Sequence, residues 1–306
     1  MRSGIFIILL VAIGIMACVP SGTADSGKLK IVATTGMIGD AVAVIAGDKA
    51  EVSTLMGPGV DPHLYKATQG DLSTLRAADL VFYNGLHLEG KMQEIFDRLS
   101  EDKPVFAVSD AVPDSLLRVT SSSGTSVTHD PHLWFDVQLW MRCVALIGQK
   151  LQEQDAEHAE YYAARTAAYL EELRALDDTV RTLIASIPEA NRILITSHDA
   201  FGYFGKTYGI QVKGLQGIST AAEFGLKDIT DMVDLIITDS IKAVFVESSV
   251  SEKSIQAVME GCAQKGHPIK QGGVLYSDAM GAKGTAEGTY LGMVKHNAIV
   301  ISEALR

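Results

Sequence analysis

The chain contains few cysteines, three among 306 residues. Cys18 lies near the N-terminus, whereas Cys143 and Cys262 each fall on the apolar stripe of a predicted helix. Both are therefore expected in the core, and a disulfide is the less favoured alternative because it also requires two helices to meet. Because the thiols are so few, none is available to make a metal site prefer soft ions. No catalytic cysteine motif is present.

Basic residues are also scarce, since 26 Lys and Arg stand against 37 Asp and Glu. Removing residues 1–17 takes away Arg2 and no acidic residue, so 25 basic against 37 acidic residues leave a net charge of −12. This balance argues against nucleic acid or an anionic membrane surface as a partner. It suits a protein that handles cations.

The N-terminal apolar run, residues 5–16, is too short to span a bilayer but has the length of a signal-peptide core. Residues 1–17 are therefore predicted to be a signal peptide, and residues 18–28 a flexible tether. The segment Ile-Met-Ala-Cys at 15–18 resembles a bacterial lipobox, which makes Cys18 a candidate for lipidation. An ordinary cleaved signal peptide is the alternative. Both interpretations predict export, to the periplasm or to the outer face of the cytoplasmic membrane.

Beyond residue 28, short apolar runs alternate with amphipathic segments. Such alternation predicts right-handed βαβ units, and hence an α/β fold with two lobes, each a four-stranded parallel sheet flanked by helices. The predicted strands are 31–34, 52–56, 80–83 and 105–108 in the first lobe, then 193–196, 211–214, 243–246 and 273–275 in the second. The predicted helices beside them are 38–46, 70–78 and 91–99, then 200–208, 227–240, 251–265 and 289–305.

The middle of the chain has a different texture. Residues 112–129 are rich in Ser and Thr and predict an exposed loop. Residues 136–152 and 157–187 predict two amphipathic helices, the second about 45 Å long. A helix of that length would span both lobes, and a dimeric coiled coil is disfavoured because the heptad pattern barely lasts two repeats. The predicted monomer therefore consists of a first lobe at 29–135, linking helices at 136–190 and a second lobe at 191–306.

The tetrapeptide Asp-Pro-His-Leu occurs at 61–64 and again at 130–133. Asp followed by Pro is a common helix start with Asp as the N-cap, and either copy alone is consistent with that purely structural interpretation. Two further residues favour a metal site: His198 directly follows one predicted strand, and Asp278 follows another. Ligands bind beyond the carboxyl ends of parallel strands. If the two lobes face each other, one site is formed by His63, His132, His198 and Asp278.

Three neutral imidazoles and one carboxylate suit a borderline divalent ion, Zn²⁺ first, with Mn²⁺ or Fe²⁺ as alternatives. Calcium or magnesium would require several oxygen donors. Glu247, at the end of a predicted strand, is a candidate for orienting a ligand imidazole from behind, and His87 is a weaker one. His129 is interpreted as a solvated loop residue. No phosphate-binding loop, dinucleotide motif or Ser-His-Asp order is present.

A resemblance to a known family rests on four stretches: Met-Gly-Pro-Gly-Val-Asp-Pro-His at 56–63, Asp-Pro-His-Leu-Trp-Phe-Asp at 130–136, Ser-His-Asp-Ala-Phe-Gly-Tyr-Phe at 197–204 and Ser-Asp-Ala-Met at 277–280. The sequence resembles the TroA-type metal-binding proteins, the extracytoplasmic receptors of ABC transporters for zinc and manganese. The resemblance covers essentially everything after the tether. It implies two α/β lobes joined by a long helix, a permease of the cytoplasmic membrane as partner, and as metal ligands His63, His132, His198 and Asp278.

The favoured function is therefore a binding protein, not an enzyme, that delivers a divalent metal to a permease. A zinc-dependent hydrolase is one alternative, but a catalytic zinc keeps an open position, and four protein ligands would close the tetrahedron. A metal-stabilised surface adhesin is another, although nothing in the sequence encodes an adhesive surface. Family members that prefer manganese tend to have Glu at the position of His198. Zinc is therefore expected to bind this chain more tightly than manganese.

Overall fold

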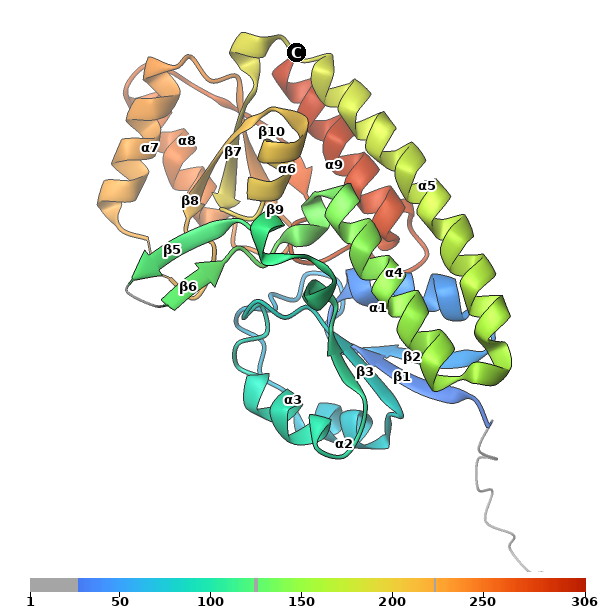
Figure 1. Cartoon of the computed structure of the whole chain (residues 1–306). Coiled ribbons are helices and arrows are strands. Elements are labelled where there is room, and N and C mark those ends of the chain that lie inside the picture. Colours follow the sequence, from blue (N-terminus) through green and yellow to red (C-terminus); the bar gives the residue numbers. More distant parts are fainter. Residues whose placement is uncertain (1–26, 124–125, 223) are drawn as a thin grey trace, which may run out of the picture.

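The computed structural model describes residues 27–123, 126–222 and 224–306. Two parallel sheets carry helices on their faces, and a long helix runs along one side of the molecule (Figure 1). The predicted α/β fold with two four-stranded parallel sheets is confirmed. The predicted signal peptide and Cys18 lie outside the described residues. Within those residues, no helix combines the length and the apolar character needed to cross a membrane.

The first lobe consists of β1 (Leu29–Ala33), α1 (Gly36–Ala46), β2 (Ala50–Thr54), α2 (Gln69–Ala77), β3 (Leu80–Tyr83), α3 (Gln93–Ser100) and β4 (Val105–Ala107). The strand order is β2-β1-β3-β4, with parallel neighbours. Side chains alternate across β1: Ile31 and Ala33 pack with α1, whereas Val32 packs with α2 and α3 on the other face. Because both faces are covered at the centre of the sheet, β1 and β3 are mostly apolar, whereas the edge strand β2 carries exposed polar residues.

The prediction of an exposed loop at 112–129 is wrong. This stretch contains an antiparallel hairpin, β5 (Val119–Ser123) and β6 (Ser126–His129). The Ser and Thr residues resemble turn formers in sequence, but the strands pair in register, Ser121 with Thr128, and the hydroxyls of Thr120 and Thr128 meet across them with Oγ1 atoms 2.9 Å apart. Just before β5, the backbone N–H of Arg118 donates to Tyr203 Oη at 2.9 Å. The base of the hairpin therefore lies against the second lobe.

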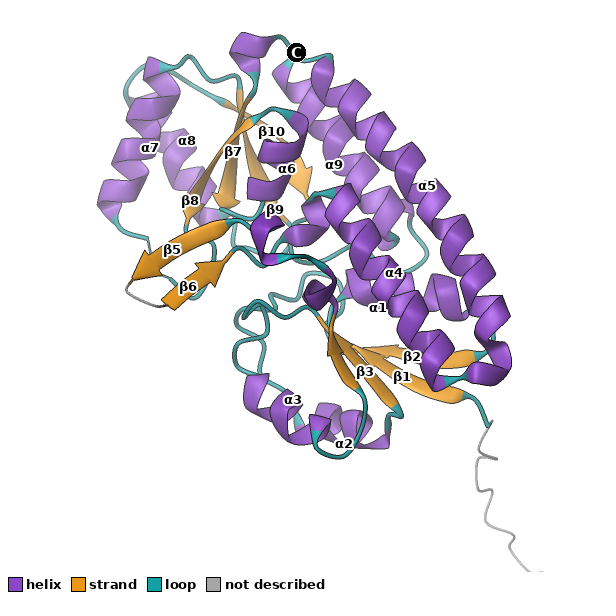
Figure 2. Cartoon of the chain, viewed as in Figure 1, coloured by secondary structure: helices purple, strands orange, loops and turns teal. Residues whose placement is uncertain are grey.

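The second lobe consists of β7 (Ile193–His198), α6 (Gly202–Tyr208), β8 (Gln211–Gln216), α7 (Leu226–Thr238), β9 (Ala243–Glu247), α8 (Lys253–Gln264), β10 (Lys270–Leu275) and α9 (Tyr290–Leu305). Its strand order is β10-β9-β7-β8, again with parallel neighbours. Ile195 and Val244 pack with α7 and α8, whereas Leu194 and Phe245 pack with α6 and α9 on the opposite face. Figure 2 shows this sheet between its helices.

Two helices connect the lobes, α4 (Val137–Gln154) and α5 (Ala159–Ala185). The 27 residues of α5 correspond to about 40 Å. It packs against α1 of the first lobe and α9 of the second (Figure 1), as predicted for a helix that spans both. Tyr169 of α5 donates to Asp40 Oδ2 in the first lobe at 3.4 Å, and Asp177 of α5 accepts from Tyr208 Oη in the second at 2.8 Å.

One hydrophobic core runs through both lobes and the linking helices; it includes Ile38, Phe82, Trp140, Leu173, Phe245 and Met293. Because this core crosses from lobe to lobe, it marks no boundary between domains. The domain boundaries predicted at 135/136 and 190/191 therefore stay predictions. Cys143 lies in the shared core and Cys262 in a second cluster under α7 and α8, both buried and free. The lobes are thus held in a fixed relation by packing as well as by α5.

Replacing Tyr208 by Phe is expected to weaken the attachment of α5 to the second lobe. Asp177 is only 3% exposed, so losing the donor from Tyr208 should lower the free energy of unfolding by about 1.5–3 kcal/mol. Urea titration of the metal-free protein measures this. The matched control is Tyr161→Phe, which removes an exposed hydrogen bond to Asp48 and should change the free energy by less than about 0.5 kcal/mol. Equal effects of the two substitutions would contradict the argument.

Candidate metal centre

Three of the four candidate ligands lie beyond the carboxyl ends of strands in the two parallel sheets, and the fourth, His132, follows strand β6 of the hairpin. His63 lies in the loop after β2, and His132 lies between β6 and α4. His198 is the last residue of β7, and Asp278 follows shortly after β10. Parallel strands place such segments along one edge of each sheet, and here the two edges meet at the boundary between the lobes. The structure brings together the four side chains that the sequence singled out.

The two Asp-Pro-His copies form the same local turn. The Asp61 carboxylate accepts a hydrogen bond from the backbone N–H of His63 at 2.9 Å, and Asp130 accepts one from His132 at 3.0 Å. Aspartate side chains commonly fix a turn in this way, by bonding the backbone two residues on. Neither aspartate caps an α-helix, so the helix-start interpretation is wrong for both copies; Asp136 caps α4 instead. The repeat presents an imidazole from a tight turn.

The donor atoms have the spacing of a tetrahedral site. Asp278 Oδ1 lies 3.3 Å from His132 Nε2, while Asp278 Oδ2 lies 3.2 Å from His198 Nε2 and 3.6 Å from His63 Nε2. His63 Nε2 and His132 Nε2 are 3.3 Å apart, and all four donors lie within 4.8 Å of one another. Donors about 2.1 Å from a central ion would be about 3.4 Å apart at the corners of a tetrahedron. Four of the donor distances are thus close to the tetrahedral value, and a divalent ion fits once the wider pairs, up to 4.8 Å apart, draw together.

The cluster is almost closed to solvent. His63 retains 7% exposure, and the other three side chains are 2% exposed or less. In the described part of the chain, His198 Nε2 and both oxygens of Asp278 have no hydrogen-bond partner. Buried polar atoms without a partner are rare in folded proteins. Their chemistry, imidazole nitrogen and carboxylate oxygen, is that of ligands for a divalent transition metal.

Carboxylates hold two of the three imidazoles from behind. Asp130 Oδ1 lies 2.7 Å from His132 Nδ1, and Glu247 Oε2 lies 2.5 Å from His198 Nδ1. Glu247 Oε1 also accepts the backbone N–H of His198 at 2.8 Å. When these imidazoles are neutral, the carboxylate beside each Nδ1 favours a proton on that nitrogen, so the Nε2 lone pair can face a metal. Glu247 stands where the sequence suggested an orienting carboxylate.

Other residues depart from the sequence interpretation or add to it. The contact between Asp130 and the imidazole of His132 was not predicted from the sequence, although the position of Asp130 in the repeated tetrapeptide could have indicated it. His87 is exposed, with a positive φ of 63°. Together with His129 it lines a cavity of about 430 Å³, outside the four-residue cluster.

The buried charges shift the pKa values of the cluster in opposite directions. Burial lowers the pKa of His63 to about 4. Burial acts in the same sense on His132, but the carboxylates of Asp278 and Asp130 outweigh it and raise its pKa to about 9. Glu247 and Asp278 likewise overcome burial and hold the pKa of His198 well above its ordinary value. The pKa of Asp278 lies well below its usual range, because His198 and His132 outweigh its burial.

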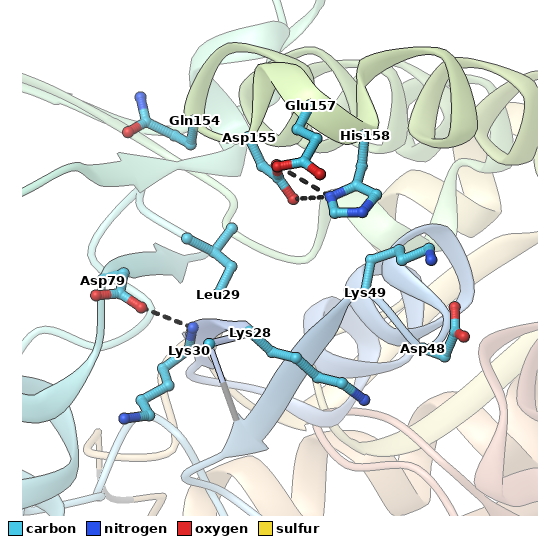
Figure 3. A pocket seen from close by; sticks show the side chains of 11 residues that line it. Lys28, Leu29, Lys30, Asp48, Lys49, Asp79, Gln154, Asp155, Glu157 and His158 are labelled. Atoms are coloured by element: carbon cyan, nitrogen blue, oxygen red, sulfur yellow. Dashed lines mark hydrogen bonds and ion pairs between the residues drawn. The ribbon is translucent and has the colours of Figure 1, made fainter. Parts of the chain in front are cut away.

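A separate cavity of about 640 Å³ lies beside the start of β1 (Figure 3). Its charged side chains come from β1, the turn between α1 and β2, and the connection between α4 and α5. Several interact with one another: His158 Nδ1 lies 2.9 Å from Asp155 Oδ2, and the backbone N–H of Lys30 donates to Asp79 at 2.8 Å (Figure 3). None of the four clustered residues lines this cavity, so it is separate from the candidate metal centre.

Comparison with known proteins points to one family. A family model described as zinc-uptake complex component A, periplasmic, matches residues 31–304. The manganese-binding lipoprotein MntA of Bacillus subtilis is 49% identical over 311 residues, covering 100% of both chains. The iron ABC transporter substrate-binding lipoprotein MtsA of Streptococcus pyogenes is 32% identical, covering 95% of this chain and 94% of that protein.

The zinc-binding protein TroA of Treponema pallidum is similar in both sequence and structure. Its sequence is 45% identical and covers 92% of this chain and 90% of its own length. Its solved structure, titled a periplasmic zinc-binding protein, superposes with a TM-score of 0.88 over 91% of this chain and 99% of that one. The likeness therefore extends through both lobes and the linking helices.

Metal uptake by the metal-free protein is expected to release protons at neutral pH. Metal needs neutral imidazoles, yet the raised pKa values of His132, about 9, and His198 keep both protonated without metal. His63, whose pKa is about 4, is already neutral and releases none. The apparent affinity for zinc should therefore rise as pH increases from about 6 toward 9. Calorimetry in buffers of different ionisation enthalpy counts the protons, and an affinity independent of pH over this range would contradict the expectation.

Proposed function

The chain belongs to the zinc-uptake complex component A family of periplasmic proteins, and we propose that it is the extracytoplasmic solute-binding protein of a metal ABC transporter. It captures a divalent transition metal between its two lobes and delivers the metal to a permease of the cytoplasmic membrane. Its cargo ligands are His63, His132, His198 and Asp278. The observation that carries this assignment is the buried three-imidazole, one-carboxylate cluster with tetrahedral donor spacing.

The geometry supports cargo binding over catalysis. A hydrolytic zinc keeps one coordination position for water, with a base beside it. Here four protein donors cluster around one centre, and all are buried, His63 being the most exposed of them at 7%. The carboxylates behind His132 and His198 are occupied with ring nitrogens. The donor set therefore favours holding a metal over activating water on it.

The names of the relatives mention three different metals, manganese, zinc and iron. The metal that this chain binds is therefore inferred from the chemistry of its donor atoms. Nitrogen donors raise affinity for later first-row ions more than for Mn²⁺, which prefers oxygen and higher coordination numbers. Zinc is therefore expected to bind most tightly, with Mn²⁺ and Fe²⁺ as weaker cargo. Both oxygens of Asp278 face the cluster, so bidentate coordination can give Mn²⁺ an extra oxygen donor.

The N-terminus sets the location. Several relatives are named as lipoproteins, and the segment around Cys18 resembles a lipobox. We propose that Cys18 is lipidated and that residues 18–28 tether a monomer to the outer face of the cytoplasmic membrane, within reach of its permease.

Stoichiometric metal uptake tests the proposal. A chelator-stripped sample should bind one zinc ion per chain, and free zinc about 100-fold above the dissociation constant should stabilise it by about 2.7 kcal/mol. His132→Ala should weaken binding by more than the about 10–100-fold typical of losing a supporting carboxylate. His87→Ala is the matched control and should keep the affinity and the stoichiometry. Identical melting with and without zinc, or zinc-dependent ester or peptide hydrolysis, would refute the proposal.

Selectivity is expected to depend on His198. His198→Glu replaces a nitrogen donor by a charged oxygen donor, so the ratio of zinc affinity to manganese affinity should fall. Competition titrations of both metals against wild type and variant measure the ratio. His87→Glu makes the same substitution outside the cluster and should leave the ratio unchanged. A ratio that stays constant or rises in His198→Glu would contradict the assignment of this side chain.

A further inference from the structure

One cation outside the cluster reaches a candidate ligand through a single carboxylate. Arg118 Nη1 lies 2.7 Å from Asp130 Oδ2, and the other oxygen of Asp130 lies 2.7 Å from His132 Nδ1. Asp130 is fully buried, while the Arg118 side chain is 30% exposed. A continuous path of two short contacts thus links a partly exposed guanidinium to an imidazole of the metal centre.

The surroundings of Arg118 are built to hold its guanidinium in this place. A Cβ atom added to Gly202 would lie 1.1 Å from Arg118 Nη1, so only glycine at this position leaves room for the side chain. The guanidinium lies over the ring of Tyr203, 5.7 Å from its centre. The hydroxyl of Tyr203 in turn accepts the backbone N–H of Arg118 and donates to the carbonyl of Asp130. Gly202 and Tyr203 of the second lobe therefore hold Arg118 and Asp130 in place.

The pair fixes the orientation of the Asp130 carboxylate. With Oδ2 held by Arg118, Oδ1 faces both the backbone N–H and the Nδ1 of His132, at 3.0 and 2.7 Å. That arrangement sets the ring angle and directs Nε2 toward Asp278. Glu247 differs, because among the described residues it pairs with no lysine or arginine and orients itself through the backbone N–H of His198 instead.

We propose that Arg118 is a positioning residue for the metal site, acting on His132 through Asp130, an inference that rests on the proposed metal-binding function. The guanidinium also carries a positive charge that would repel a cation. It is paired with a carboxylate and separated from the donors by both Asp130 and His132, so positioning outweighs repulsion. Arg118 also lines a surface cavity of about 390 Å³ with Asp199, Gly202 and Lys206, which makes it the outermost member of the path.

Zinc titrations of the full chain test the proposal with three variants. Arg118→Gln should weaken zinc binding by about 10–100-fold, the usual effect of losing an outer partner of a ligand. Arg118→Lys keeps the charge and should retain more affinity than the glutamine variant. Gly202→Ala leaves Arg118 in the sequence but displaces its guanidinium, and should also weaken binding. The control Arg174→Gln makes the same charge change on exposed α5, where Arg174 pairs with Glu171, and should bind as wild type.

A spectroscopic signal separates positioning from general stability. In zinc-saturated wild type, NMR should show the ring Nδ1 proton of His132 protected from exchange by Asp130, and Arg118→Gln should reduce that protection. In an Asp130→Asn background, Arg118→Gln should cause no further loss of affinity. If Asp130→Asn does not fold, the three variants above still decide.

Three results would overturn the inference. The first is zinc binding by Arg118→Gln that is as tight as, or tighter than, that of Arg174→Gln. The second is an equal loss for the Lys and Gln variants that follows a fall in the melting temperature of the metal-free protein. The third is unchanged protection of the His132 ring proton. Failure of wild type itself to bind zinc would instead refute the proposed function, so the two failures are distinguishable.

Discussion

The molecule depends on one buried carboxylate that faces three imidazoles at the boundary of two lobes. Asp278 is 2% exposed and lies 3.2–3.6 Å from the Nε2 atoms of His63, His132 and His198. Removing an uncompensated carboxylate from water costs several kcal/mol. Protons on the imidazoles compensate this charge in the metal-free chain, and a divalent ion does so in the loaded chain. Metal and protons therefore compete for the same place, and the protein never has to bury the bare charge.

This constraint explains the rigid scaffold around the site. Four donors from separate segments must meet at spacings close to those of a tetrahedron, so the lobes cannot drift apart freely. The shared core and α5 hold them together. Beside the site, Trp134 Nε1 donates to the carbonyl of Ser277 at 3.1 Å, and Tyr290 Oη donates to the carbonyl of Trp134 at 2.7 Å. Wide closure about a hinge would bend α5 and break its backbone hydrogen bonds. Metal exchange is therefore expected through local rearrangement and small shifts of packed helices.

The sequence predicted what local patterns encode. Apolar runs at the strands, and the apolar spacing of Leu173, Leu176 and Val180 on α5, reflect packing along single elements, so the fold class and the spanning helix follow from periodicity. The hairpin did not, because Ser- and Thr-rich residues such as Ser121 and Thr128 form strands only by pairing across it. The ends of the elements also shifted by a few residues, since caps such as the Thr68 and Asp71 pair at α2 have weak sequence signals.

The candidate site likewise has residues that could be predicted from the sequence and residues that could not. A repeated tetrapeptide and strand-end positions identify His63, His132 and His198 from the sequence. Arg118 could not be found, because its contacts with Asp130 and Tyr203 arise only when the hairpin folds against the second lobe. The same holds for the distance between Glu247 and His198, which depends on the pairing of β7 with β9. Tertiary contacts of this kind leave no periodic trace in the sequence.

The three imidazoles differ in their burial and in whether a carboxylate contacts their Nδ1 atom. His132 and His198 are fully buried, and each has a carboxylate on Nδ1. His63 lies on a loop, keeps 7% exposure and has no such carboxylate among the described residues. Its turn is tied to the second lobe through Asp61, which accepts from Thr220 Oγ1 at 2.6 Å. Moving His132 or His198 would separate the ring from a buried carboxylate and leave that carboxylate without its partner, which is costly. Moving His63 requires the loss of contacts nearer the surface, so His63 is the ligand whose displacement costs least.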